Sequence, residues 1–180
     1  SALMGDALAA SAALVADGSD SLPPPDASGM ALRAKVCTGC HGDQGRAGPD
    51  GFYPRLAGKP STYLYRQLLA FRDGDRQYRP MERLLKGLPN VYLRAFADYF
   101  AALDPPYPSP PPTQADAATL ALGERLVREA SRADNAGRCI DCHGSTLLGD
   151  DVRAPALHGL SRDYLNAQLG AWRAGQRQTP

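Results

Sequence analysis

Hydrophobic side chains recur at helical spacing in several stretches of the chain. In residues 61–72 the apolar positions are Leu64, Leu68 and Phe71, spaced i, i+4 and i+7. Gly74 follows and is placed to end this helix. Further helices are predicted at 29–36, at 82–86, around 119–130 and after Asn90, where one face carries Tyr92, Phe96, Tyr99, Phe100 and Leu103.

The aromatic helix after Asn90 is expected to pack against the helix at 29–36. Gly29 lacks a side chain, so we expect the two helices to approach closely at that residue. Met30 lies on the same predicted helix, seven residues before Cys37, and is expected to pack in the core.

The second half of the chain repeats the pattern of the first at an offset of 101 residues. Residues 54–58 correspond to 155–159, and the same helix with the same apolar stripe is expected in both halves. Before Cys139 the second half has a polar insertion, 131–138, that the first half lacks. The matching pairs are Tyr63/Tyr164, Leu64/Leu165, Gln67/Gln168, Leu68/Leu169, Phe71/Trp172, Arg72/Arg173, Gly74/Gly175 and Arg76/Arg177.

A proline-rich segment separates the two repeats. Six of the eight residues 105–112 are prolines, which favours an extended, semi-rigid spacer. The predicted organisation is an N-terminal arm at 1–28, a first domain at 29–103, a linker at 104–116 and a second domain at 117–180. The arm contains an alanine-rich stretch that could form a helix, 7–15, and ends in Pro23, Pro24 and Pro25; packing or disorder is the role expected of it.

The charge and hydropathy of the chain exclude several classes of partner. The formal net charge is +1, which predicts no strong attraction to nucleic acid or to a membrane surface. No run is long and apolar enough to cross a membrane. The short apolar segment 7–16 lacks a basic flank, so we interpret it as part of the mature chain or a remnant of processing and not as an intact signal peptide. We therefore expect no nucleic acid partner, and membrane contact only through a partner protein.

The chain contains the pattern Cys-x-x-Cys-His twice. The first copy consists of Cys37, Cys40 and His41, and the second of Cys139, Cys142 and His143. This is the attachment signature of a c-type haem. Two thiols on one helical turn can add to the two vinyl groups of the porphyrin, and the adjacent imidazole can bind the iron axially.

Other uses of a Cys-x-x-Cys pair explain the chain less well. A zinc site could combine the two pairs into four sulfur ligands, but it would leave both trailing histidines without a role. A redox disulfide of the thioredoxin type expects one motif in a β-α-β setting, which the sequence lacks. The two motifs use all four cysteines and two of the three histidines. We therefore predict two covalent haem c groups, each also serving as an apolar core for a small domain.

Met81 is the candidate for the second axial ligand of the first haem. It follows Pro80 in a predicted loop, and a soft thioether ligand raises the haem potential. Arg55, Tyr53 and Tyr63 are candidates to hydrogen-bond the carboxylates of the first haem, although ordinary packing explains each of them equally well.

Residues 29–103 resemble a class I cytochrome c domain. The shared features are an N-terminal helix, Cys-x-x-Cys-His, a loop, a middle helix, a Pro-Met pair and an aromatic C-terminal helix. The resemblance implies an all-α fold of two tandem domains, each wrapped around one covalent haem with its edge exposed for electron transfer. It implies Cys37 and Cys40 as tethers, His41 as the proximal ligand and Met81 as the distal ligand. In the second domain, Cys139, Cys142 and His143 take the corresponding roles.

The whole chain resembles dihaem cytochromes of the c-four type and the dihaem subunits of periplasmic dehydrogenases. This resemblance implies a periplasmic, bacterial electron carrier without enzymatic activity, whose redox partners are an oxidase, a dehydrogenase or another cytochrome. Two alternatives stay open. One is a dihaem enzyme, a peroxidase or sulfur-compound dehydrogenase with an open second haem; the other is a fixed electron-transfer subunit of a dehydrogenase.

The second domain departs from the repeat at its end. Adding the offset to Met81 leads to position 182, beyond Pro180. We expect this domain to be truncated before its distal ligand and its closing aromatic helix. Otherwise His158, Met4 or water would complete the second haem.

Overall fold

The computed structural model describes residues 26–48, 50–109, 112–129, 137–150 and 154–178. Regular structure in these residues is helical, apart from one isolated antiparallel bridge between Arg76 and Arg177. The all-α prediction is therefore confirmed. The predictions for the N-terminal arm up to residue 25, including Met4, lie outside the described residues, as does most of the insertion at 131–138.

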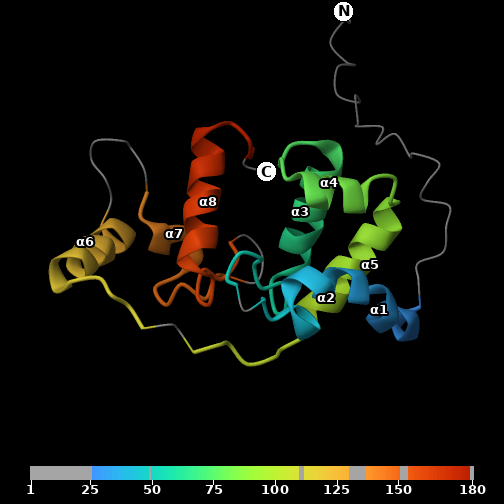
Figure 1. Ribbon diagram of the computed structural model, residues 1–180, viewed down its shortest axis with the longest axis horizontal. Coiled ribbons are helices and arrows are strands. Elements are labelled where there is room, and N and C mark those ends of the chain that lie inside the picture. Colours follow the sequence, from blue (N-terminus) through green and yellow to red (C-terminus); the bar gives the residue numbers. More distant parts are fainter. Residues whose placement is uncertain (1–25, 49, 110–111, 130–136, 151–153, 179–180) are drawn as a thin grey trace, which may run out of the picture.

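The first unit packs its helices around one core, visible as the blue-to-green half of Figure 1. Met30, Ala34, Leu64, Phe96, Ala97 and Phe100 form the buried cluster, so the prediction that Met30 packs in the core is confirmed. The elements are α1 (Ala27–Arg33), α2 (Lys35–His41), the 3₁₀ turn η2 (Asp43–Gly45), α3 (Ser61–Asp73), α4 (Arg79–Leu85) and α5 (Asn90–Ala101).

The N-terminal helical stretch differs from the prediction in two ways. It is divided at Ala34 into α1 and α2, and it begins inside the predicted arm because the Asp26 carboxylate caps α1 by accepting from the Gly29 N–H at 2.6 Å. The predicted packing of this stretch against α5 is confirmed. The atoms nearest a Cβ at Gly29 belong to Arg33 and Asp26, so the close approach of α5 at Gly29 itself stays a prediction. The small side chains buried in the core shared with α5 are Ala34 and Ala97.

Helix α4 begins earlier than the sequence suggested. Met81 was expected in a loop, but it lies in the first turn of α4. Pro80 is tolerated there because first-turn N–H groups have no acceptor within the helix. The Glu82 carboxylate accepts from the Tyr78 N–H at 2.6 Å and so satisfies the backbone just before the helix. This contact extends the helix over the Pro-Met pair.

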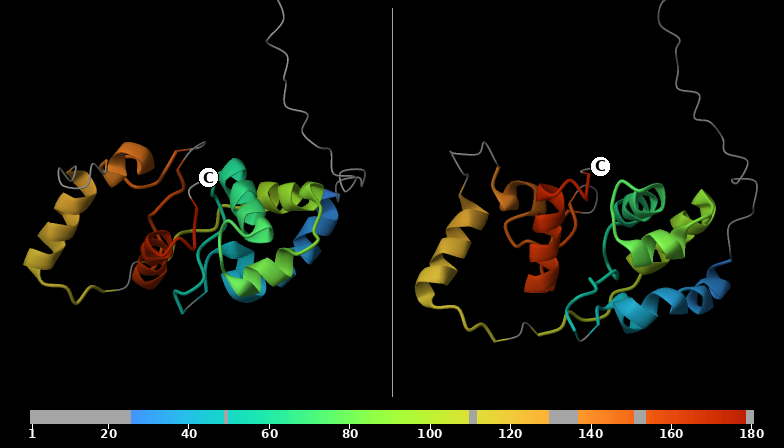
Figure 2. Two further views of the ribbon diagram at one scale, coloured as in Figure 1. Left: turned by 90° about the horizontal axis from the view of Figure 1, so that it is seen from above. Right: turned by 45° about the horizontal axis from the view of Figure 1, so that its top comes forward.

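The second unit contains α6 (Ala117–Arg128), α7 (Cys139–His143) and α8 (Arg162–Arg173). Helix α8 is the predicted repeat of α3, and the Ser161 hydroxyl caps it by accepting from the Tyr164 N–H at 3.0 Å. None of these three helices has a buried residue. Helix α8 stands beside the first unit, and α6 lies at the far end of the molecule (Figures 1 and 2).

The described helices include none that is both long and apolar enough to pass through a bilayer.

Candidate functional site

Helix α2 carries the first motif at the edge of the core. Cys37 is half-buried and Cys40 exposed, while the His41 ring is buried. The Nδ1 atom of His41 lies 2.7 Å from the Pro54 carbonyl oxygen, which fits an N–H donor and leaves Nε2 for a metal. Burial lowers the pKa of His41, and so favours the neutral imidazole that binds metals.

Helix α7 repeats this arrangement in the second unit. The Nδ1 atom of His143 lies 2.8 Å from the carbonyl oxygen of Pro155, the residue that corresponds to Pro54 at the offset of 101. Arg138 and Asp141 form an ion pair of 2.6 Å that caps the start of α7. The same hydrogen bond to a proline carbonyl therefore orients both histidines.

None of the four cysteines forms a disulfide, and all four lie at the surface or near it. Burial, with a smaller contribution from Cys40, raises the pKa of the Cys37 thiol to about 11. Within the described residues, no three His, Cys, Asp or Glu side chains converge as metal ligands would. The four cysteines, all of which are described, therefore do not form a zinc site.

A cavity of about 790 Å³ opens beside α2 and lies within the roughly 300–1,000 Å³ typical of cofactor pockets. His41 from α2 and Met81 from α4 both line it, together with Cys37 and Cys40. Most of the remaining wall is apolar and includes Leu64, Leu68, Phe71, Leu85, Phe96 and Phe100. The structure thus brings the four predicted residues of the first site to one cavity, although ligation by Met81 stays a prediction.

The two units meet at one end of this cavity through backbone contacts. Arg76 and Arg177 pair in the antiparallel bridge. The Gln77 N–H donates to the Gln176 carbonyl at 2.8 Å, and the Gln178 N–H to the Asp75 carbonyl at 2.9 Å. Each unit therefore contributes the segment that follows its repeated helix.

Side chains at the same place form a nearly two-fold network. Arg76 donates to the Gln67 and Gln168 side-chain oxygens at 2.7 and 2.6 Å. Arg177 donates to the same two oxygens at 3.3 and 2.8 Å. Arg76 also donates to the Tyr164 hydroxyl at 2.8 Å. Each glutamine oxygen therefore bridges two guanidinium groups, one from each unit.

The network concentrates positive charge that the described residues do not neutralise. Arg55, Lys59, Arg76 and Arg177 are all buried and line the cavity, and no described carboxylate forms an ion pair with any of them. Among the described side chains, the Arg177 Nε is a buried nitrogen without a hydrogen-bond partner. Burial lowers the pKa of Lys59 to about 8 and also lowers the pKa of Arg177.

Buried cations without anions are costly, so this cavity suits a bound group that carries carboxylates. A haem combines an apolar ring with two carboxylates, and it fits both the apolar wall and the cationic end. Arg76 and Arg177 are placed to receive those carboxylates. In the sequence these arginines stand out only as a matching pair at the offset of 101 residues, and that shared offset was the signal that could have identified them.

The earlier candidates for the haem carboxylates have different surroundings. Arg55 donates from all three of its guanidinium nitrogens to backbone carbonyls. Tyr53 packs edge-on against the His41 ring, with centroids 5.9 Å apart. Tyr63 lies near Arg177, and burial raises the pKa of its hydroxyl. Of the three, Tyr63 is the one in contact with the arginine network.

His158 is exposed and packs against the linker. Its ring lies edge-on to Tyr107, with centroids 5.2 Å apart, in the loop that follows Pro155. Ligation of the second haem by His158 stays a prediction.

Comparison with known proteins agrees with this site. A family model described as cytochrome c matches residues 27–104. Cytochrome c4 of Pseudomonas aeruginosa is 33% identical over 153 residues, which cover 84% of this chain and 73% of that protein. This chain belongs to the cytochrome c family, in the branch that includes cytochrome c4. Its cofactor is accordingly covalently bound haem c.

Two further similarities refine the assignment to the cytochrome c family. The thiosulfate dehydrogenase electron acceptor of Thiomonas intermedia is 41% identical over 145 residues, covering 80% of this chain and 65% of that protein. The crystal structure of reduced cytochrome c4 from Pseudomonas stutzeri superposes with a TM-score of 0.72 at 29% identity. That match covers 85% of this chain and 83% of the solved one. The chain thus spans 65% of the length of the Thiomonas relative.

Proposed function

We propose that this cytochrome is a dihaem electron carrier that passes single electrons between redox proteins in the bacterial periplasm. The observation that carries the proposal is the repeated histidine arrangement. In both motifs Nδ1 lies within hydrogen-bond distance of a proline carbonyl, at 2.7 Å for His41 and 2.8 Å for His143. Each unit therefore presents one oriented imidazole beside two thiols, which is what one haem c requires.

The residues of the first unit leave little room for substrate chemistry. When bound, the haem supplies the one-electron couple of its iron. His41 and Met81 line the cavity from α2 and α4, and we assign them as the two side chains that would bind the iron. Cys37 and Cys40 would hold the ring covalently, and Arg76 and Arg177 would bind its carboxylates. With both iron ligands supplied by the protein, a substrate would have no place to coordinate.

The rim of the cavity suggests how a partner docks. Val36, Phe52 and Leu84 line the cavity and are exposed large hydrophobic residues. Residues 26–103 contain nine lysines and arginines that are not buried, against seven aspartates and glutamates. A partner with an acidic face around an apolar centre would match this surface. Raising the ionic strength should then slow electron transfer to such a partner.

A haem count combined with ligand spectroscopy tests the proposal. The haemochrome assay gives haems per chain, and the methionine-to-iron charge-transfer band of the oxidised protein gives methionine-ligated haems. We expect two haems, at least one of them methionine-ligated. One haem per chain would overturn the dihaem assignment. If Met81→Ala kept the full charge-transfer band, the assignment of Met81 as an iron ligand would be overturned. Met30→Leu is the matched control, because Met30 is buried in the core.

A second candidate function is a fixed electron-accepting subunit of a dehydrogenase. The similarity to the thiosulfate dehydrogenase electron acceptor favours it. Co-purification with a dehydrogenase at constant stoichiometry, resistant to salt, would support the fixed subunit. A monomeric cytochrome reduced by a separable enzyme would support the mobile carrier.

The alternative enzymatic function would require an open coordination position on the iron of the second haem. Residues 104–180 contain no methionine, and His158 packs against the linker. Completion of that site by a methionine beyond Pro180 stays a prediction. Binding of carbon monoxide or cyanide at the second haem of the native protein would favour the enzyme, whereas inert haems would favour the carrier.

A further inference from the structure

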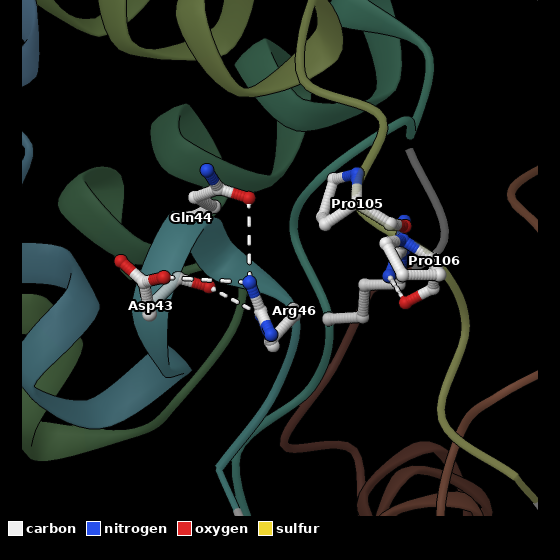
Figure 3. A network of polar contacts seen from close by, with 6 residues as sticks. Asp43, Gln44, Arg46, Pro105 and Pro106 are labelled. Atoms are coloured by element: carbon white, nitrogen blue, oxygen red, sulfur yellow. Dashed lines mark hydrogen bonds and ion pairs between the residues drawn. The ribbon is translucent and has the colours of Figure 1, made fainter.

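Arg55 links the first unit to the interdomain linker. The side chain is 2% exposed, and its Nε donates to the Ala57 carbonyl at 3.0 Å within its own loop. The two terminal nitrogens donate to the carbonyls of Pro105 and Pro106. Figure 3 shows these two prolines passing beside the loop of the first unit. The start of the linker is therefore hydrogen-bonded to a buried cation.

Tyr107 continues this contact into the second unit. The Arg55 guanidinium lies over its ring, 4.1 Å from the centroid. The other neighbours of the ring are His158 and Gly159. A Cβ at Gly159 would come within 2.5 Å of the ring, and the residue has φ of 75°, so glycine is required there. Tyr107 is thus packed between the two units.

Lys59 makes a second, independent connection. Its side chain is buried, and its Nζ donates to the Ala156 carbonyl of the second unit at 3.0 Å. The repeat places Leu160 at the position that corresponds to Lys59, so no lysine makes the reciprocal contact. The connection therefore runs in one direction, from the first unit to the loop of the second.

These contacts end beside the two carbonyls that orient the histidines. Arg55 directly follows Pro54, whose oxygen lies 2.7 Å from His41 Nδ1. Ala156 directly follows Pro155, whose oxygen lies 2.8 Å from His143 Nδ1. A displacement of either loop would change the hydrogen bond at its histidine, and that bond sets the basicity of an iron ligand.

We propose that Arg55, Lys59 and Tyr107 form an interdomain clasp that positions the histidine-holding loop of the second unit from the first. The clasp fixes the relative placement of the two haem sites, and through the Pro155 carbonyl it tunes the potential of the second haem. The proposal about potential rests on the proposed function, since it needs a haem at each motif. The start of the linker is then held to the first unit by hydrogen bonds, in addition to being the semi-rigid spacer expected from its prolines.

The first test separates the two connections. Lys59→Met removes the donor to Ala156 while keeping an apolar stem of similar length. Because Lys59 also lines the cavity of the first unit, its loss should lower the midpoint potential of the first haem directly. The clasp predicts an additional shift at the second haem, which Lys59→Arg should partly restore. An unchanged midpoint potential at the second haem would overturn the role of Lys59 in positioning the loop.

The second test measures how firmly the clasp holds the two units together and needs no redox measurement. Tyr107→Ala removes the packed ring, whereas Tyr107→Phe keeps it and serves as the matched control. We expect hydrogen exchange of the 156–160 amides to rise about tenfold in Tyr107→Ala, because exchange follows the local opening equilibrium. We also expect a larger radius of gyration by small-angle scattering. Exchange and scattering curves identical to those of Tyr107→Phe would overturn the clasp.

Failure of the clasp can be told apart from failure of the proposed function. A haem count of one per chain would refute the dihaem carrier, yet the exchange and scattering measurements would still decide whether the units are clasped. A count of two with unchanged exchange and potentials would refute the clasp alone.

Discussion

The two units contain the same repeated helix, but only the first unit buries it. In α3, Leu64 is 7% exposed and Leu68 packs against the core cluster. In α8, the counterpart of Leu68 is Leu169, which is 60% exposed, and Trp172 is 40% exposed. The two sequences agree closely at the shared offset, so local pattern alone does not decide burial.

The difference comes from a third element. In the first unit, α5 packs against both α1 and α3 and contributes Phe96, Ala97 and Phe100 to the core. The described part of the second unit has no counterpart of α5. Leu120, Leu122 and Leu126 on α6 are exposed. An amphipathic helix forms from its own sequence, but its apolar face is buried only when a partner covers it.

Removing one core side chain should show the largest difference between the units. We expect Phe96→Ala to lower the free energy of unfolding by about 3–5 kcal/mol, because it leaves a cavity in the buried cluster. Leu169→Ala is the matched change on the exposed helix and should stay within about 0.5 kcal/mol. Urea unfolding followed by circular dichroism measures both. Equal losses would mean that α8 is packed as tightly as α3.

The pH dependence of stability should reveal the buried Lys59, whose counterpart in the second unit is Leu160. Burial lowers the pKa of Lys59 from 10.5 to about 8, so between these values the unfolded chain binds more protons than the folded one. Stability should therefore rise with pH through this window, by about 3 kcal/mol at most. Lys59→Met should remove the rise. The comparison requires denaturant unfolding at several pH values, and a flat profile in the unmodified protein would contradict it.

The interface arginines should act on the midpoint potentials of both haems, because each unit contributes one of them to the shared network. A buried cation beside a haem favours the reduced state, so Arg76→Met and Arg177→Met should each lower a midpoint potential. We expect roughly 60 mV, the one-electron equivalent of a tenfold change in equilibrium constant. Arg46→Met, at an exposed position paired with Asp43, is the control and should leave both potentials unchanged. Spectroelectrochemical titration measures these midpoint potentials. A rise in potential in either arginine variant would contradict the expectation.

The smallest effect should be the same in both units, because it is local. Gly74 and Gly175 have φ of 93° and 67°, and a Cβ at either would meet no atom within 4 Å. Gly74→Ala and Gly175→Ala should each cost about 1 kcal/mol through backbone strain alone. Hydrogen exchange in α3 and α8 would measure the two losses separately. A much smaller loss at Gly175 would indicate that the end of α8 is frayed.

Much of the local structure could be predicted from the sequence. Residues 61–72 were expected as a helix, and α3 spans Ser61–Asp73 with Gly74 in the left-handed conformation at its end. The residues proposed to attach the haem could also be identified from the sequence, because covalent attachment needs two thiols on one helical turn and an adjacent imidazole. Met81 was identified by type, but its place in α4 was not, since the Glu82 contact with Tyr78 is a local detail that periodicity does not reveal.

By itself, then, the sequence determined the helices, their repeat at an offset of 101 residues, and the two attachment motifs. These features depend on contacts between residues close along the chain, which periodicity and spacing encode. The tertiary structure alone decided that Arg76 and Arg177 meet, that Arg55 binds the linker, and that Lys59 reaches Ala156. Such pairings depend on burial. A buried cation loses its hydrating water and must be compensated by the few acceptors within reach. Which groups are buried is decided by how the two units pack.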